Sequence, residues 1–268
     1  LVLKTQAAMT EKTEEEMFAT MERSLQVMKE SVQDGLDKDK RSASGLTGGD
    51  AYKLNEALKA GKNIAGHFFG NAMMKAVAVA QTNACMGRIV ASPTAGSCGI
   101  LPSALLTLQE EKNISDKDLV MALFTASAVG IVIATNASVA GAAGGCQAEC
   151  GAASAMAAAA MVELCGGTPK QCEHACAIAL KNILGLVCDP VAGLVEIPCI
   201  KRNAGGVGNA LVAAELALAG VESHIPADEV IVAMKKIGDT MSSTLKETAE
   251  GGLAVTPTGK KLCEKVFG

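Results

Sequence analysis

The clearest periodic pattern of apolar and polar positions lies near the start of the chain. Five apolar residues recur there at three- and four-residue steps, the spacing of one helix face: Met17, Met21, Leu25, Met28 and Val32. Thr13 stands three residues before Glu16, which is the arrangement of a capping box, so a helix is predicted to begin here. Gly35 follows the last apolar position and is predicted to stop the helix.

Helical patterning resumes after residue 50 and accounts for most of the remaining chain. One stretch runs from about Ala51 to Asn83, and an apolar run follows from Ile100 to Leu108. Pro169 and Pro226 stand near two predicted starts, as proline in a first helical turn allows. The further helices are predicted at residues 116–134, 146–165, 170–186, 205–220 and 226–248.

Strand signals are weak, because alternating β-branched residues never run far, and there is no repeat of fixed period. The chain has 268 residues and 49% hydrophobic content, enough for one sizeable core. Aromatic residues make up 2% and glycines number 28, so small side chains must fill that core and let helices pack closely. We therefore expect a mainly α fold: one compact multi-helix domain over residues 1–268, with glycine-rich active-site loops. Residues 1–12 are expected to be loosely ordered.

Charge and hydropathy argue against two classes of partner. The net charge is −4 and no basic block occurs, so nothing indicates nucleic-acid binding. Residues 119–147 carry no charge and are numerous enough to span a membrane. However, polar residues at 135–138 and several glycines interrupt them, and basic flanks and an aromatic belt are missing. We therefore expect two buried segments around a functional loop, and no membrane partner.

Two loops rich in hydroxyl groups and glycine are candidate anion sites. In the first, residues 42–50, small side chains and free amides suit a carboxylate. The second, residues 91–99, feeds a predicted helix start, where exposed amides and the helix dipole attract anions. Each could equally be an ordinary loop or capped turn. With the polar interruption at 135–138, the candidate substrate-binding residues are Ser44, Thr47, Gly48, Thr94, Gly96, Ser97, Asn136 and Ser138.

Ten cysteines are many for a chain of this length. Disulfide scaffolds serve small secreted domains with poor cores, so reduced thiols in the cytoplasm fit this composition better. Ordinary burial as small apolar residues is the expected role of four of them: Cys85, Cys165, Cys172 and Cys176.

Three other cysteines stand among glycines or prolines. Cys188 and Cys199 bound a run with two prolines and a glycine, which cannot form one continuous helix and could double back to bring both sulfurs together. Cys146, in a distant glycine-rich turn, could supply a third sulfur, and Cys150 could replace it from one helical turn away. Three thiolates leave a coordination position open, as in catalytic rather than structural centres. No CxxC pair accompanies them, so spacing alone leaves burial open as the alternative.

Four segments together carry a resemblance to a known family. They are SGLTGGDA at residues 44–51, ASPTAGSCGILP at 91–102, GGCQAECGAASAMAA at 144–158 and CDPVAGLVEIPCIKRNA at 188–204. In this order and composition the chain resembles the alpha subunit of bacterial iron–sulfur L-serine dehydratases. The resemblance implies a largely α fold and a [4Fe-4S] cluster on Cys146, Cys188 and Cys199, with one iron lacking a protein thiolate. It also implies conversion of L-serine to pyruvate and ammonia without pyridoxal phosphate.

The resemblance also bears on partners and on one contact. Single-chain relatives carry a beta domain before the first helix, so we expect a beta subunit as a separate polypeptide here, making a heteromer. Many of these relatives have an asparagine where Ala95 stands, so one substrate contact is expected to differ.

The implied chemistry needs a Lewis acid for the departing hydroxyl group and a base for the α-proton. The open iron would supply the first. Among the histidines, His67 is the candidate base, while His174 and His224 are expected to have structural or surface roles. Lys201 and Arg202 follow Cys199 and could stabilise the anionic cluster or bind the substrate carboxylate. Asn203 is expected to cap a following helix.

Alternatives remain open at this stage. A cluster-dependent L-cysteine desulfidase or L-threonine dehydratase would differ only in the substrate pocket. A non-catalytic iron–sulfur protein would be expected to have four thiolates, and a zinc protein with three cysteines would need a carboxylate base such as Glu149 or Glu196. A pyridoxal phosphate enzyme is disfavoured, since no lysine stands between residues 119 and 169.

Overall fold

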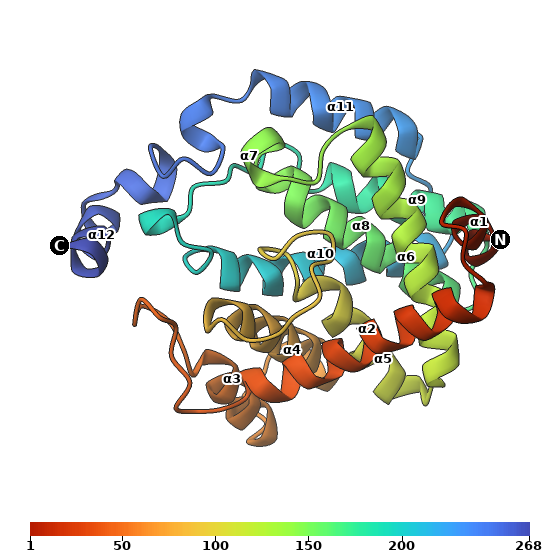
Figure 1. Ribbon diagram of the computed structural model, residues 1–268, viewed down its shortest axis with the longest axis horizontal. Coiled ribbons are helices and arrows are strands. Elements are labelled where there is room, and N and C mark those ends of the chain that lie inside the picture. The colour runs from red at the N-terminus through yellow and green to blue at the C-terminus, as the bar shows by residue number, and fades with distance from the viewer.

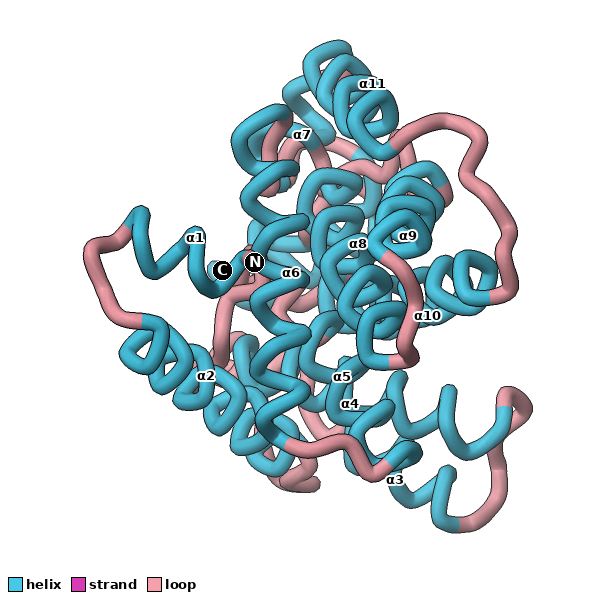
Figure 2. Tube along the Cα trace, turned by 90° about the vertical axis from the view of Figure 1, so that its right-hand side faces the viewer, coloured by secondary structure: helices cyan, strands magenta, loops and turns pink.

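The computed structural model describes residues 1–268 as twelve α-helices without a β-sheet (Figure 1). No strand is drawn in the second view (Figure 2), and the one isolated bridge pairs Cys188 with Lys246. The helices are α1 (Val2–Met9), α2 (Glu14–Gly35), α3 (Asp50–Lys59), α4 (Gly66–Ala84), α5 (Ile100–Lys112), α6 (Asp116–Asn136), α7 (Gly141–Gly144), α8 (Cys146–Leu164), α9 (Pro169–Lys181), α10 (Cys199–Leu218), α11 (Ala227–Thr240) and α12 (Pro257–Phe267). Three short 3-10 turns are η1 (Val191–Gly193), η2 (Ser243–Leu245) and η3 (Gly252–Val255). The expected mainly α fold is confirmed.

Helix α8 is the centre of the molecule. Every residue from Cys146 to Val162 is buried, and alanine is the commonest residue among them. Helices α5, α6, α9 and α10 pack around α8 (Figures 1 and 2). Alanine side chains let these helices approach closely, so one core of 53 buried residues forms with few large side chains. The small-residue composition therefore produces the close packing that was expected.

The predicted start of α2 after Thr13 and its predicted end at Gly35 are both confirmed. Thr13 Oγ1 accepts the Glu16 N–H at 3.1 Å, and Glu16 Oε2 accepts the Thr13 N–H at 2.9 Å. Gly35 is the last residue of α2 and does not adopt the left-handed conformation of a stop signal. A Cβ at this position would overlap the backbone of Ala78 on α4. Gly35 therefore serves close contact between α2 and α4.

Several predicted boundaries are corrected by the structure. The stretch from Ala51 to Asn83 forms two helices, α3 and α4, separated at residues 60–65, where Gly61 has a φ of 66°. Helix α10 begins at Cys199 rather than residue 205, and α11 ends at Thr240 rather than residue 248. Helices α1, α7 and α12 were not predicted; α1 occupies the start that was expected to be loosely ordered, and its Ala7 is buried.

Helix α6 differs from the expectation of two buried segments. It is long and apolar enough to cross a membrane by length and composition, with 39% of its most apolar window buried. Met121, Ile131 and Val132 are exposed along it. Of the two segments, α8 is therefore the buried one and α6 is only partly covered.

The chain after α11 turns back to the loop between α9 and α10. The Cys188 N–H donates to the Leu245 carbonyl at 2.9 Å, and the Glu247 N–H donates to the Cys188 carbonyl at 2.8 Å. Farther on, α12 packs against η1, so that the C-terminus lies beside this loop at the left of Figure 1. The C-terminal segment therefore helps to enclose Cys188.

Replacing Gly35 with alanine is expected to destabilise the fold by about 1–3 kcal/mol, the usual cost of overpacking. The new Cβ would overlap the Ala78 carbonyl oxygen, so one of the two helices would have to shift. Urea unfolding should show a lower midpoint. Gly205→Ala on α10 is the control, because a Cβ there meets no atom within 4 Å. A Gly35→Ala midpoint at or above that of the wild type would contradict this packing.

Candidate active site

The fold brings together the three cysteines that the sequence singled out. Cys146 is the first residue of α8, Cys199 is the first residue of α10, and Cys188 lies in the loop after α9. Burial and then the charge of Cys146 raise the pKa of Cys199 to about 12, and the same two causes raise the pKa of Cys188. Each of these thiols therefore lies within electrostatic reach of Cys146.

Glycines allow the backbone to approach this group of sulfurs. A Cβ on Gly141 in α7 would lie 2.9 Å from Cys188 Sγ, so the α7 backbone passes directly against that sulfur. Gly145, immediately before Cys146, has a φ of 78°, which only glycine adopts readily. Gly145 therefore sets the start of α8, and Gly141 allows the close approach to Cys188.

Positive potential converges on the same place. The N-termini of α8 and α10 carry partial positive charge, which favours anions and thiolates. Arg202, in the first turn of α10, donates to the Val187 carbonyl and to the Asp189 carboxylate, each at 2.8 Å. Its charge also contributes to lowering the pKa of Cys146, after the larger effect of the hydrogen bond between Cys146 and Cys150. Arg202 and the two helix N-termini therefore supply positive charge at a site that also holds the carboxylates of Asp189 and Glu149.

Cys150 lies beside Cys146, as the one-turn spacing on α8 predicted. Their sulfurs are 3.3 Å apart, at hydrogen-bonding distance. That hydrogen bond, together with burial, raises the pKa of Cys150. Across the whole chain, no group of three or more His, Cys, Asp or Glu side chains is placed to hold a single metal ion.

The second predicted loop, residues 91–99, contacts a carboxylate that the sequence did not assign to it. Thr94 Oγ1 donates to Glu149 Oε1, and Thr94 also lies 3.0 Å from the Ser97 hydroxyl. A Cβ on Gly96 would lie 2.6 Å from the same Glu149 oxygen. Glu149 is 8% exposed and burial raises its pKa. Thr94, Gly96 and Ser97 therefore gather around Glu149, one turn along α8 from Cys146.

Asn203 fixes this loop to α10, and the capping role predicted for it is wrong. It lies inside α10 because that helix begins at Cys199. Its amide nitrogen donates to the Gly96 carbonyl at 2.7 Å and to the Cys199 carbonyl at 2.9 Å, and its oxygen accepts the Gly99 N–H at 2.9 Å. The side chain is fully buried.

The first predicted loop, residues 42–50, also meets a carboxylate. Ser44 Oγ donates to Glu196 Oε1 at 2.7 Å, and Thr47 Oγ1 donates to Glu196 Oε2 at 2.5 Å. Glu196 lies three residues before Cys199. Gly48 follows in the loop with a φ of 143°, and a Cβ there would overlap the Lys40 carbonyl oxygen. Its tight contact with residues 40–41 holds the loop in place.

Other predicted site residues lie elsewhere. Asn136 is exposed and donates to the Val132 carbonyl, and Ser138 accepts the Ala140 N–H. Lys201 forms an exposed ion pair with Asp50 at 2.8 Å. None of these three contacts involves a cysteine of the site.

His67, the predicted base, is exposed at the start of α4. Two residues farther on, Phe69 lies against Gly208 of α10. Gly208 is nine residues beyond Cys199, about 13 Å along the helix. The structure therefore does not bring His67 to the cysteines.

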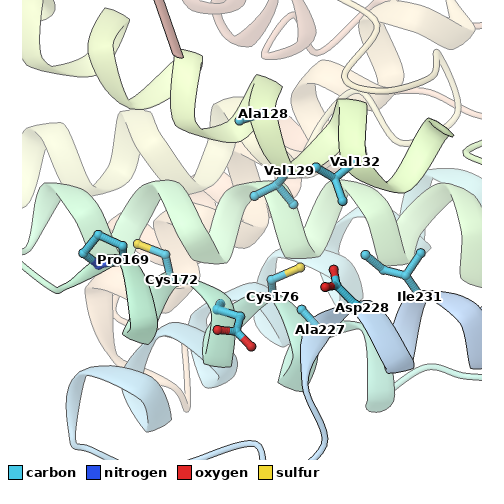
Figure 3. Close-up of a pocket in the computed structure, with 10 residues that line it drawn as sticks. Ala128, Val129, Val132, Pro169, Cys172, Cys176, Ala227, Asp228 and Ile231 are labelled. Atoms are coloured by element: carbon cyan, nitrogen blue, oxygen red, sulfur yellow. The ribbon is translucent and has the colours of Figure 1, made fainter. Parts of the chain in front are cut away.

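A separate hollow of about 250 Å³ lies between α6, α9 and α11 (Figure 3). Val129, Val132 and Ile231 line it together with Cys172 and Cys176. Cys176 is buried and Cys172 partly so, in keeping with their expected role as small apolar residues. None of the three clustered cysteines lines this hollow.

Known proteins to which this chain is similar carry the name serine dehydratase. A family model described as serine dehydratase alpha chain matches residues 1–254. The probable L-serine dehydratase alpha chain of Bacillus subtilis is 56% identical over 259 residues, which cover 97% of this chain and 86% of that protein. The L-serine dehydratase alpha chain of Peptoniphilus asaccharolyticus is 46% identical over 262 residues, covering 98% and 90%. The L-serine dehydratase TdcG of Escherichia coli is 42% identical over 184 residues, covering 68% of this chain and 40% of that protein.

Glu149→Gln is expected to stabilise the cluster-free protein at pH 7–8. Because the pKa of Glu149 is raised, the folded state binds its proton more tightly than the unfolded chain, and ionisation above the ordinary pKa weakens the fold. Glutamine removes this cost. The stability advantage of the variant should therefore fade below about pH 4, where Glu149 of the wild type is protonated in both the folded and the unfolded state. Urea unfolding at several pH values would measure it, with exposed Glu163→Gln on the same helix as the control. A variant less stable than the wild type at pH 8 would contradict this account.

Proposed function

The chain belongs to the family of serine dehydratase alpha chains, and on this basis we propose that it is the catalytic subunit of an L-serine dehydratase. The substrate would be L-serine and the products pyruvate and ammonia. The observation that carries this proposal is the convergence of Cys146, Cys188 and Cys199 from three distant segments at two helix N-termini.

The donor set fits a [4Fe-4S] cluster. Thiolates are the usual protein ligands of such clusters, and each binds a separate iron, so the sulfurs need not meet at one point. This agrees with three mutually interacting cysteines that are not arranged around a single ion. The helix N-termini and Arg202 would offset the negative charge of the bound thiolates. Cys146, Cys188 and Cys199 would therefore hold the cluster, with Cys150 beside Cys146.

When bound, the cluster would supply a Lewis acid, through the iron without a protein thiolate, for the β-hydroxyl group of serine. The reaction removes the α-proton and the β-hydroxide, and the resulting aminoacrylate tautomerises to an imine. Water then hydrolyses the imine to pyruvate and ammonia. The positive potential around Arg202 favours the negatively charged substrate carboxylate in the same region.

Glu149 is a better candidate than His67 for handling the α-proton. It lies one turn from Cys146, whereas His67 is exposed at the start of α4, away from the cysteines. Its Oε1 accepts the Thr94 hydroxyl proton, which orients the carboxylate and leaves Oε2 to take a proton. Burial raises its pKa, as suits a group that must both accept and release a proton near neutral pH.

A second polypeptide is part of the proposal. The matched region covers only 40% of the Escherichia coli protein, while the Bacillus subtilis relative is named an alpha chain. We propose that a beta subunit supplies here what the remaining part supplies in the longer relatives. The active enzyme would then be a heteromer.

Cys188→Ala is expected to abolish both cluster assembly and turnover, since one of three thiolate ligands is lost. The enzyme would be prepared without oxygen together with its beta subunit, and iron, sulfide, visible absorption and pyruvate release from L-serine would be measured. The wild type should be brown with about four irons and four sulfides per chain. Cys176→Ala, at the separate hollow between α6, α9 and α11, should retain colour and activity.

The outcomes separate the alternatives. A brown wild type that releases no pyruvate would favour a non-catalytic cluster protein, and a colourless active one would favour zinc. Faster turnover of L-threonine or L-cysteine would reassign the substrate. Undiminished pyruvate release by Cys188→Ala would overturn the proposed centre.

A further inference from the structure

Glu196 is a buried carboxylate without a cationic partner. It is 5% exposed, and its two oxygens accept the hydroxyl protons of Ser44 and Thr47. No lysine, arginine or histidine nitrogen lies within 4.0 Å of it. A buried charge normally needs an ionic partner, because hydroxyl groups replace only part of the lost hydration. Glu196 therefore has two hydroxyl partners and no cationic partner within the chain.

The basic residues just before this loop are engaged elsewhere. Lys40 pairs with Asp34, and Arg41 donates to the carbonyls of Lys38 and Lys40. Lys201, five residues after Glu196, pairs with Asp50. Lys40, Arg41 and Lys201 could therefore reach Glu196 only by breaking these interactions.

Glu196 lines an open cleft of about 540 Å³. Ser44, Ala95 and Gly193 line it too, and most of the remaining wall is apolar. The cleft shares Ala95 with the 94–97 turn, whose Thr94 and Gly96 contact Glu149, and Glu196 is three residues before Cys199 in the sequence. A small molecule in the cleft would meet one carboxylate among apolar groups.

We propose that Glu196 binds the α-ammonium group of the amino-acid substrate, with Ser44 and Thr47 as positioning residues. This inference rests on the proposed function, because it assigns the ammonium subsite of that reaction. A carboxylate offers about four acceptor sites, and the two hydroxyl groups occupy two of them. The others remain for an ammonium group, which has three donors and no acceptor.

With Glu196 as the ammonium site, the loop at residues 42–50 has a different role from the carboxylate binding that was expected. Ser44 and Thr47 direct their protons to Glu196, so they do not offer them to the substrate carboxylate. The substrate carboxylate is then left to the positive region around Arg202 and the two helix N-termini. An α-amino acid would be recognised by opposite charges at its two ends.

The test uses a pair of unreactive ligands that differ at one group. L-Alanine and L-lactate share the carboxylate and methyl group, but lactate has a hydroxyl in place of the ammonium. Their inhibition constants against L-serine turnover would be measured for the reconstituted wild type and Glu196→Gln. We expect the variant to bind L-alanine about 10- to 100-fold more weakly, the worth of a hydrogen bond to a charged group, with L-lactate binding unchanged or stronger. The KM for L-serine should rise by a similar factor.

Glutamine keeps the shape of Glu196; its oxygen can accept one hydroxyl proton, and the other hydroxyl group can rotate to accept from its amide nitrogen. A purely structural role would therefore leave the ratio of L-alanine to L-lactate binding unchanged. Glu196→Asp, which retains the charge, should bring the ratio of the L-alanine and L-lactate inhibition constants part of the way back to the wild-type value. Exposed Glu30→Gln on α2 is the control and should leave this ratio unchanged. Iron content and circular dichroism would show whether each variant is assembled. If Glu196→Gln weakened the binding of L-alanine and L-lactate equally, or left the ratio of their inhibition constants unchanged, the ammonium assignment would be overturned. A wild type that releases no pyruvate from L-serine would instead contradict the proposed function itself.

Discussion

The ion pair between Arg202 and Asp189 holds the three cysteine-bearing segments together. Arg202 belongs to the first turn of α10 after Cys199, and Asp189 follows Cys188 directly; their side chains are 18% and 4% exposed. The same aspartate accepts the Leu253 N–H at 2.8 Å, which fastens the C-terminal segment, and the arginine acts electrostatically on Cys146 at the start of α8. At such low exposure an unpaired partner would be costly, so the segments stay together as a unit.

The core composition makes this arrangement possible. Two helices can begin at one site only if their axes come close, and alanine and glycine permit this in α8 and at the contacts of α10. Gly206 of α10 shows how closely the helices are packed, since a Cβ there would overlap Ile100 at the start of α5. A core of larger side chains would separate the helix N-termini and weaken the field that they direct at the thiolates.

The sequence predicted what local patterns can encode. The capping box at Thr13 and the three cysteines among glycines and prolines were recognisable, because a cap and a loop are properties of neighbouring residues. The roles of Asn203 and Glu196 were not, because each depends on a partner more than a hundred residues away. The contact of Gly35 with Ala78 on α4 was missed for the same reason, because a glycine that ends a helix and a glycine that admits another helix look alike in sequence. The early start of α10 at Cys199, directly after Pro198, was missed because the prolines indicated a longer loop.

Two buried carboxylates lie on either side of the 94–97 turn, and this placement has a mechanistic consequence. Thr94 and Gly96 face Glu149, while Ala95 lines the cleft with Glu196. Asn203 bonds the turn to the first turns of α10, which also carry Cys199. Glu149 lies on α8, and Glu196 lies in the loop directly before α10, where Ser44 and Thr47 hold its carboxylate. If one carboxylate handles the proton and the other holds the ammonium group, both groups are fixed near the starts of α8 and α10, the helices whose first residues would hold the cluster. Such rigid support is what precise positioning of a reacting bond requires.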